Sequence, residues 1–336
     1  MNVHSDAVTV IAEAGVNHNG SVDTAREMAR LAAQAGADFV KFQTFDPDAV
    51  VAAGGPTAEY QQNQGYTDQR SMLATLRLRE ADHTELKSYC DELGIGFLST
   101  PFDLASVELL RRLGQTTWKI ASGEITNVPL IERIAEIAEE VIMSTGMATL
   151  GEIEQALSWL DGAGCPRERV TVLHCNTEYP TPYEDVNLRA MQTIADAFGV
   201  RVGYSDHTLG TEVPVAAVAM GARVIEKHFT LDRSAEGPDH RASLEPQELA
   251  DMVSRIRHVE AALGDGIKRV SESEKKNREL VRKGVYAATR IKKGEGFSAE
   301  NVTTKRPAHA TDAAQWARVM QATAQRDYEP DEAIEL

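Results

Sequence analysis

The sequence predicts a barrel of eight β-then-α units, the (β/α)8 or TIM barrel, followed by a small β-rich domain. Eight short apolar runs alternate with stretches of helical period, most of these stretches end at a glycine, and polar residues close the apolar runs. The 336 residues suffice for a barrel of about 250 residues and an appendage. In such a barrel the carboxyl ends of the strands share one mouth, so those polar residues would line one pocket.

The predicted strands are the apolar runs, and chemistry-bearing side chains stand at or just after their ends. In chain order the runs cover residues 9–12, 38–43, 97–99, 117–118, 141–143, 170–173, 202–204 and 224–226. The side chains at their ends are Glu13, Lys41, Gln43, Thr100, Lys119, Ser122, Glu124, Ser144, Thr177, Ser205, His207 and His228.

The predicted helices lie between these runs. The clearest covers 23–35, where Asp23 or Thr24 can cap an apolar stripe that ends before Gly36. Further helices are expected at 82–93, 103–113, 127–139, 151–160, 187–198, 211–220 and 245–263. Glycine just past a helix allows φ > 0 and turns the chain into the next strand. The alternation predicts parallel strands joined by right-handed crossovers.

An open doubly wound sheet is the alternative to the barrel. No glycine-rich dinucleotide motif follows the first strand, where residues 13–20 read EAGVNHNG, and this favours the barrel. The polar stretch from Asp46 to Glu80 breaks the rhythm and is equally consistent with a functional lid or a plain surface excursion. After Gly264 the pattern changes, so we place the barrel in 1–265, a linker helix in 266–281 and the small domain in 282–336. A domain of that size has a thin core, so we expect it to pack on the barrel or a second subunit.

Composition excludes several classes of function. A formal net charge of −16 argues against nucleic acid as the main partner, because phosphate contacts need a basic face. No apolar run approaches the roughly 18 residues of a membrane helix. The three cysteines have no paired spacing, which indicates reduced thiols. The first residues show no signal-peptide pattern, so we expect a cytoplasmic protein.

Two histidines at the ends of neighbouring strands form a candidate metal site. Taken alone, His207 and His228 are more often ordinary buried histidines than ligands. The nearby carboxylates Glu13 and Asp239 favour a divalent ion with open coordination positions, such as Mn²⁺. A structural zinc site would need four ligands and leave no open position.

Two lysines at strand ends form a candidate anion site. Lys41 and Lys119 face the same mouth, and hydroxyls and glycine-rich turns at 122–123, 144–146 and 205 add donors. This set suits a phosphate-bearing anion. The alternative is that the lysines only pair with Glu13 or Glu124. The stiff loop at 179–183 is either a turn or a wall for a polar ligand.

Several ordered motifs resemble those of the sialic acid synthases (N-acetylneuraminate synthases) and of the similar N,N'-diacetyllegionaminate synthases. They are IAEAGVNHNG at 11–20, VKFQT at 40–44, LSTPFD at 98–103, KIASGE at 119–124, STGM at 144–147, YSDHT at 204–208, EKHFT at 226–230 and EGPDH at 236–240. The resemblance covers nearly the whole chain. Its C-terminal part resembles the antifreeze-like (SAF) domain that completes these enzymes.

The resemblance implies a condensation of phosphoenolpyruvate with open-chain N-acetylmannosamine and water, which yields N-acetylneuraminic acid and phosphate. The alternative acceptor is 2,4-diacetamido-2,4,6-trideoxymannose, which legionaminate synthases use. His207 and His228 would hold Mn²⁺, with Mg²⁺ or Co²⁺ as alternatives, to polarise the aldehyde. Glu13, Lys41 and Lys119 would be the catalytic residues, and Glu13 would manage the water or a proton.

The resemblance also assigns the ligand contacts. Phosphoenolpyruvate would bind Lys41, Thr100, Lys119, Ser122, Ser144, Thr177 and Ser205. The sugar would bind Gln43, Glu124, Tyr179, Asp239 and Arg306, the last supplied by the SAF domain of the other subunit of a homodimer. After Arg306 the family usually has a glycine-containing turn, but here residues 308–310 read Ala-His-Ala, whose Cβ atoms disfavour φ > 0.

Two other functions compete with this interpretation. Another barrel enzyme could use phosphoenolpyruvate with a sugar phosphate, but it would need an additional basic phosphate site. A non-catalytic carbohydrate- or ice-binding protein would explain the C-terminal domain alone. It leaves the polar strand ends without a role, and the domain lacks a regular threonine array.

Overall fold

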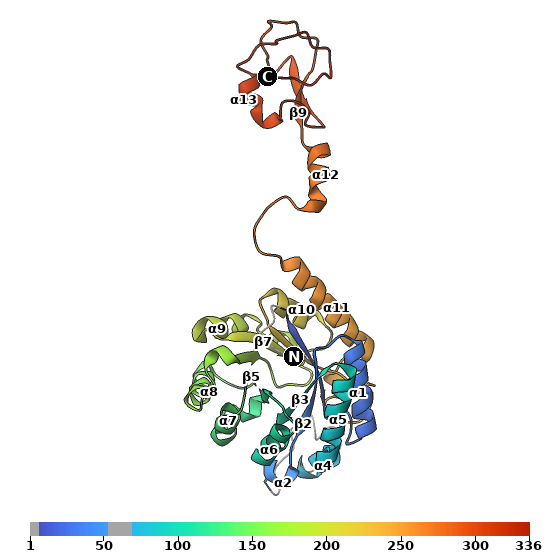
Figure 1. Cartoon of the computed structure of the whole chain (residues 1–336), viewed down its shortest axis with the longest axis vertical. Helices are drawn as coiled ribbons and strands as arrows, with labels where there is room; N and C mark the ends of the chain where they lie inside the picture. Colours follow the sequence, from blue (N-terminus) through green and yellow to red (C-terminus); the bar gives the residue numbers. More distant parts are fainter. Residues whose placement is uncertain (1–6, 53–68) are drawn as a thin grey trace. The chain divides into compact units, whose positions relative to one another are not determined.

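A computed structural model describes residues 7–52 and 69–336 of the chain. The chain divides into two compact units, the first ending at Gly264 and the second beginning at Asp265. Figure 1 shows the first unit as a ring of strands with helices around its outside. The predicted (β/α)8 barrel is therefore confirmed.

The barrel strands of the described chain are all parallel and follow sequence order around the ring. They are β1 (Thr9–Gly15), β2 (Phe39–Thr44), β3 (Gly96–Pro101), β4 (Thr117–Ile120), β5 (Glu140–Ser144), β6 (Val170–His174), β7 (Arg201–Asp206) and β8 (Val224–His228). Hydrogen bonding runs in the order β3-β2-β1-β8-β7-β6-β5-β4, and β3 also contacts β4, so the ends of the sheet meet. The register sets Glu13 beside both Lys41 and His228.

Helices cover the outside of this ring close to where the sequence predicts them. They are α1 (Val22–Gln34), α5 (Glu80–Leu93), α6 (Leu104–Arg112), α7 (Val128–Ala135), α8 (Leu150–Gly162), α9 (Arg189–Phe198), α10 (Glu212–Ala219) and α11 (Pro246–Leu263). The first helix is capped by Ser21, whose side chain accepts from the Thr24 N–H, so Asp23 and Thr24 lie inside the helix instead of capping it. Glycine caps in the left-handed conformation follow α5 and α9, as expected.

The described part of the excursion between β2 and α5 contains two further helices. These are α2 (Pro47–Val50) and α4 (Gln69–Leu76). Residues 53–68, the middle of the predicted lid at 46–80, lie outside the described residues, and the choice between a lid and a surface excursion stays a prediction.

Two apolar layers support the barrel. Inward-facing side chains form a compact plug, made of Ile11, Phe39, Leu98, Ile142, Leu173 and Val224. Outward-facing strand residues pack against the helices in a larger core. Because strand side chains alternate between the two faces, the polar strand ends above the plug point into the barrel mouth. Among the described helices none is long and apolar enough to cross a membrane.

The second unit has its own small core. This unit contains α12 (Glu272–Val281), an antiparallel pair of β9 (Gly284–Ala287) and β10 (Val302–Lys305), and the short α13 (Trp316–Val319). Its core is formed by Val285, Ala287, Ile291, Phe297, Val302, Val319, Ala324, Tyr328 and Ile334. In the turn after Arg306, Ala310 adopts φ +53°, the left-handed conformation that its Cβ disfavours. Ala310 therefore has the backbone conformation in which glycine is usually found.

Gly203 on β7 generates a test of barrel packing. A Cβ at this position would lie 2.3 Å from the Val224 carbonyl oxygen and 2.6 Å from Leu173 Cδ2, and backbone cannot move aside cheaply. We expect Gly203→Ala to lower the free energy of unfolding by about 1–3 kcal/mol, measured by chemical denaturation. Gly162→Ala in α8 is the matched control, because no described atom lies within 4 Å of its added Cβ. Equal stability of the two variants would contradict the packing described here.

Candidate active site

A pocket of about 500 Å³ opens at the carboxyl ends of the barrel strands. Most of the residues predicted from the sequence line it, namely Glu13, Lys41, Gln43, Thr100, Lys119, Ser122, Ser144, Thr177, Tyr179, Ser205, His207 and His228. Three predicted residues are placed elsewhere. Asp239 is buried beside His228, Glu124 accepts a hydrogen bond from the Asn127 amide, and Arg306 is exposed on the second unit.

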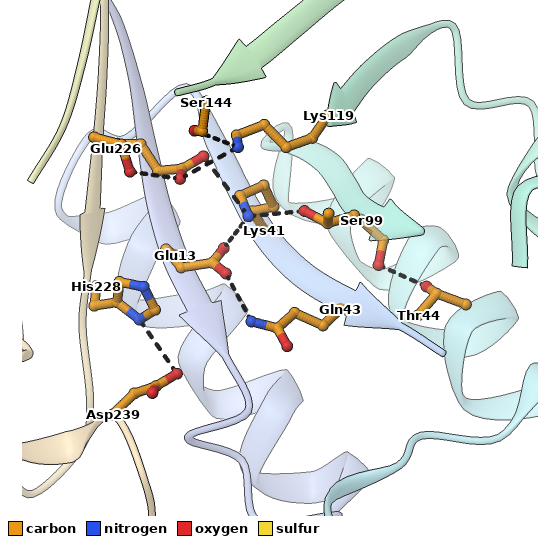
Figure 2. Close-up of polar contacts among 12 residues, drawn as sticks. Glu13, Lys41, Gln43, Thr44, Ser99, Lys119, Ser144, Glu226, His228 and Asp239 are labelled. Atoms are coloured by element: carbon orange, nitrogen blue, oxygen red, sulfur yellow. Dashed lines mark hydrogen bonds and ion pairs between the residues drawn. The ribbon is translucent and has the colours of Figure 1, made fainter. Parts of the chain in front are cut away.

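Two lysines and two carboxylates form a buried charge cluster at the bottom of the pocket (Figure 2). Lys41 Nζ lies 2.9 Å from Glu13 Oε2 and 3.6 Å from Glu226 Oε2. Lys119 Nζ lies 3.8 Å from Glu226 Oε1. The four side chains are at most 5% exposed. The predicted pairing of Lys41 with Glu13 is present, but it belongs to a wider network.

Hydroxyl groups complete the surroundings of both lysines. Lys41 Nζ donates to Thr100 Oγ1 at 2.9 Å, and Lys119 Nζ donates to Ser144 Oγ at 2.6 Å. Ser205 Oγ donates to Glu226 Oε1 at 2.9 Å. These hydroxyls come from three different strands, so the pocket presents two ammonium groups within a ring of small donors. Such a ring suits a small anion that carries both phosphate and carboxylate groups.

Burial governs the ionisation of this cluster. Burial raises the pKa of Glu13 to about 7, against the opposing effect of the Lys41 ammonium. Burial alone would lower the pKa of Lys41, but the negative charges of Glu13 and Glu226 outweigh burial and raise this pKa. Burial lowers the pKa of Lys119. Near neutral pH, Glu13 is therefore divided between its protonated and ionised forms, while Lys41 carries its charge.

Gly146 lies against three side chains that line the pocket. Its N–H donates to Ser122 Oγ at 2.9 Å, and Ser122 Oγ lies 3.3 Å from the Cys175 thiol. A Cβ on Gly146 would lie 2.5 Å from Thr177 Cγ2, 3.0 Å from Ser122 Oγ and 3.2 Å from Cys175 Sγ. Only glycine leaves these side chains in place.

The two predicted metal ligands lie side by side. The ring centroids of His207 and His228 are 5.3 Å apart, and the Tyr179 ring stacks 4.1 Å from His207. His207 Nδ1 donates to the Asn176 carbonyl oxygen at 2.5 Å, which leaves its Nε2 with a free lone pair when the ring is neutral. Burial lowers the pKa of His207 to about 4 and the pKa of His228 well below its usual value, so both rings are in the neutral, metal-binding form.

Oxygen atoms of two carboxylates and the His228 ring converge on Gly15. A Cβ at this glycine would lie 3.3 Å from Asp239 Oδ2, 3.4 Å from Glu13 Oε1 and 3.4 Å from His228 Cε1. His228 Nδ1 is buried, and the described residues offer it no hydrogen-bond partner. Within the described chain no three His, Cys, Asp or Glu side chains form a ready ligand set. The residues that could hold an ion here are thus the two imidazoles, with the remaining positions left to substrate or water.

Sequence reasoning missed several pocket residues. Glu226 is the most important, because it contacts both lysines. The sequence does carry a signal for Glu226. Residues two apart on a strand point to the same face, and His228 is predicted to lie in the barrel mouth. Phe102, Met147 and Cys175 also line the pocket. Met147 has φ +65° and is 74% exposed, and neither property is visible in the sequence.

Comparison with known proteins assigns the family. The NeuB family matches residues 28–268, most of the chain. The chain belongs to the NeuB family. The SAF domain matches residues 282–335, and both results confirm the resemblance seen in the sequence motifs. The protein is an enzyme of the NeuB family whose barrel is followed by an SAF domain.

Individual relatives of this NeuB-family enzyme cover nearly its whole length. It is 50% identical to the N,N'-diacetyllegionaminic acid synthase of Campylobacter jejuni, over 97% of this chain and 98% of that protein. The corresponding synthase of Legionella pneumophila is 46% identical over 89% of this chain and 85% of its own length. The crystal structure of the sialic acid synthetase of Leptospira borgpetersenii superimposes with a TM-score of 0.72 at 34% identity, covering 81% of this chain and 90% of that one.

Gly146 provides a test of the pocket with a matched control. We expect Gly146→Ala to raise the dissociation constant for phosphoenolpyruvate, the anion implied by the motifs, by about tenfold or more, because the added Cβ displaces Ser122 and Thr177. Gly123 lines the same pocket, yet no described atom lies within 4 Å of a Cβ placed there. Gly123→Ala should therefore bind normally in the same calorimetric titration. Wild-type affinity in Gly146→Ala would contradict this description of the pocket.

Proposed function

We propose that this enzyme condenses phosphoenolpyruvate with the open-chain aldehyde of an N-acetylated amino sugar and water, releasing phosphate and a nine-carbon 2-keto sugar acid. One observation supports it above all. Two buried ammonium groups with a ring of hydroxyls lie in the same 500 Å³ pocket as a pair of neutral imidazoles. The first set suits a phosphorylated carboxylic acid, and the second suits an ion that activates an aldehyde.

Phosphoenolpyruvate is anchored by charge and by short hydrogen bonds. Lys41 and Lys119 both belong to the buried charge cluster. Their ammonium groups contact the carboxylate and phosphate groups of phosphoenolpyruvate. The surrounding donors are Thr100, Ser122, Ser144, Thr177 and Ser205. Because these side chains are held by backbone and by one another before the ligand arrives, little reorganisation accompanies binding.

In the reaction, C3 of phosphoenolpyruvate forms a bond to the aldehyde carbon, and the aldehyde oxygen takes a proton. Water adds to C2 and loses a proton, and the resulting tetrahedral carbon expels phosphate to leave a ketone. A divalent ion bound by His207 and His228, Mn²⁺ by preference and Mg²⁺ or Co²⁺ as alternatives, would supply Lewis-acid polarisation of the aldehyde. Glu13 lies between the imidazole pair and Lys41, where it handles the proton of the attacking water.

The acceptor sugar is the finer part of the proposal. Gln43 and Tyr179 line the pocket, Tyr179 beside the imidazole pair, and Glu124, Asp239 and Arg306 complete the proposed sugar contacts. N-acetylmannosamine and 2,4-diacetamido-2,4,6-trideoxymannose both fit this reaction. The two legionaminic acid synthases are 50% and 46% identical to this chain, against 34% for the sialic acid synthetase, which favours the diacetamido sugar.

Phosphate release tests the reaction and the acceptor together. We expect purified enzyme with Mn²⁺ to release phosphate from phosphoenolpyruvate only when an acceptor sugar is present, and faster with 2,4-diacetamido-2,4,6-trideoxymannose than with N-acetylmannosamine. Chelator treatment should abolish the release, and added Mn²⁺ should restore it. Faster turnover of N-acetylmannosamine would assign a sialic acid synthase. Release with neither sugar, or release without any sugar, would contradict the proposed reaction.

The proposal includes a homodimer in which the SAF domain of one subunit completes the site of the other. Several large apolar side chains are exposed on the loops and helix starts that follow the barrel strands, namely Leu104, Met147, Leu150, Tyr183 and Leu209. Exposed apolar side chains at one end of a barrel are typical of a surface that another protein covers. A second copy of this chain would cover them and supply the partner's Arg306 to the sugar. The three cysteines of the chain are buried free thiols, which suits the cytoplasmic location in which this enzyme is proposed to work.

Mixing two inactive variants tests the shared site. Arg306→Ala removes the proposed sugar contact of the SAF domain, and Lys119→Ala removes the anion contact of the barrel. After subunit exchange, about half of the dimers are mixed and each carries one intact site, so about a quarter of the wild-type activity should return. Each variant alone, incubated in the same way, is the control. No recovered activity, or a monomer in sedimentation analysis, would contradict the proposal.

A further inference from the structure

A fully buried ion pair lies directly behind the two imidazoles. Lys227 Nζ donates to Asp206 Oδ2 at 2.5 Å, and both side chains are 0% exposed. Lys227 Nζ also donates to the Thr208 carbonyl oxygen. The Thr208 N–H and hydroxyl donate back to Asp206 Oδ1 at 3.1 and 2.9 Å. The proposed mechanism uses none of these groups.

Strand alternation explains where the pair lies. Ser205 and His207 line the pocket, as do Glu226 and His228, while Asp206 and Lys227 are absent from its described lining. The two charged residues therefore point to the outer face of the barrel, between the strands and the helices. Each immediately precedes one imidazole, and the two are register partners on β7 and β8.

The Asp206–Lys227 pair lies at the point where the ladder between β7 and β8 ends. β7 ends at Asp206, so His207 lies beyond the parallel ladder, whereas His228 is the last residue of β8. Hydrogen bonds with Asn176 and Thr181 hold His207 from the side of the loop that follows β6. Lys227 holds His207 from the outer face of the barrel. Its ammonium binds Asp206, which precedes His207, and Thr208, which follows His207.

Stability alone is a poor explanation for this network. Removing two charges from water costs several kcal/mol per ion, and well-packed apolar residues in place of a buried ion pair are often neutral or stabilising. What the pair provides is a fixed geometry, because an ammonium with three donors joins two backbone segments at defined angles.

We propose that Asp206, Lys227 and Thr208 are positioning residues that set the distance and orientation of His207 relative to His228, and so set the affinity for the divalent ion. The inference rests on the proposed metal site. It predicts that removing the network weakens metal binding even when the fold is kept. A purely structural role would change stability and leave the affinity unchanged.

The test measures Mn²⁺ binding to the chelator-treated full chain by isothermal titration and by Mn²⁺ electron paramagnetic resonance. The decisive variant is the double substitution Asp206→Asn with Lys227→Met, which keeps the volume and leaves no unpaired buried charge. We expect its dissociation constant for Mn²⁺ to rise about tenfold or more. Thr208→Val, which removes only the hydroxyl, should show a smaller rise and gives an independent answer if the double variant does not fold.

Arg257→Met is the matched control. It breaks the 2.8 Å pair between Arg257 and Asp38, which lies just before β2 and thus at the amino end of the strands. We expect this variant to lose stability in thermal unfolding and to bind Mn²⁺ as the wild type does. Wild-type Mn²⁺ affinity in the folded double variant or in Thr208→Val would overturn the inference. A wild-type protein that binds no Mn²⁺ would overturn the metal site itself, a result distinct from the first.

Discussion

The mutual compensation of four buried ionisable groups is the constraint on which the rest of this structure depends. Glu13, Lys41, Lys119 and Glu226 lie at the bottom of the mouth with almost no exposure, where an isolated charge would be prohibitively unstable. They come from β1, β2, β4 and β8, strands that are far apart in the sequence. The closed ring of parallel strands in fixed register links them in one chain of contacts, none longer than 3.8 Å. The barrel is thus a requirement of the chemistry as well as a way of burying apolar surface.

The same cluster explains how an acidic protein can bind an anion. The formal charge of the chain is −16, yet in this pocket burial raises the pKa of Glu13, while the neighbouring carboxylates raise the pKa of Lys41. The ammonium groups therefore act on an anion locally, within walls of low dielectric constant, even though the whole molecule is acidic. Hydroxyls of the neighbouring strand ends then provide direction, which the ammonium groups do not.

Much of this site could be predicted from sequence because position on a strand determines position in a barrel. Lys41, Thr100, Ser144 and His228 stand at or near the ends of apolar runs, and the rule that strand ends share a mouth was enough to place them. Glu226 does not stand out in the sequence, because two further polar residues, Lys227 and His228, follow it at the end of the same run. Residues outside the strands were harder. Glu124 is the last residue of a short 3₁₀ helix and accepts a hydrogen bond from Asn127, and the spacing along the chain carries no sign of that.

The motifs that carry the family resemblance combine two roles on alternate residues. In Ser205-Asp206-His207 and in Glu226-Lys227-His228, the first and third residues enter the pocket and the middle one points behind it. A sequence comparison sees three equivalent positions in each motif, although only two of them can touch a ligand. The middle residues reach the chemistry only through the backbone and the imidazoles that they hold. Loss of activity on replacing a motif residue is therefore no proof of contact with substrate, and the face of the strand on which it lies decides how that loss is interpreted.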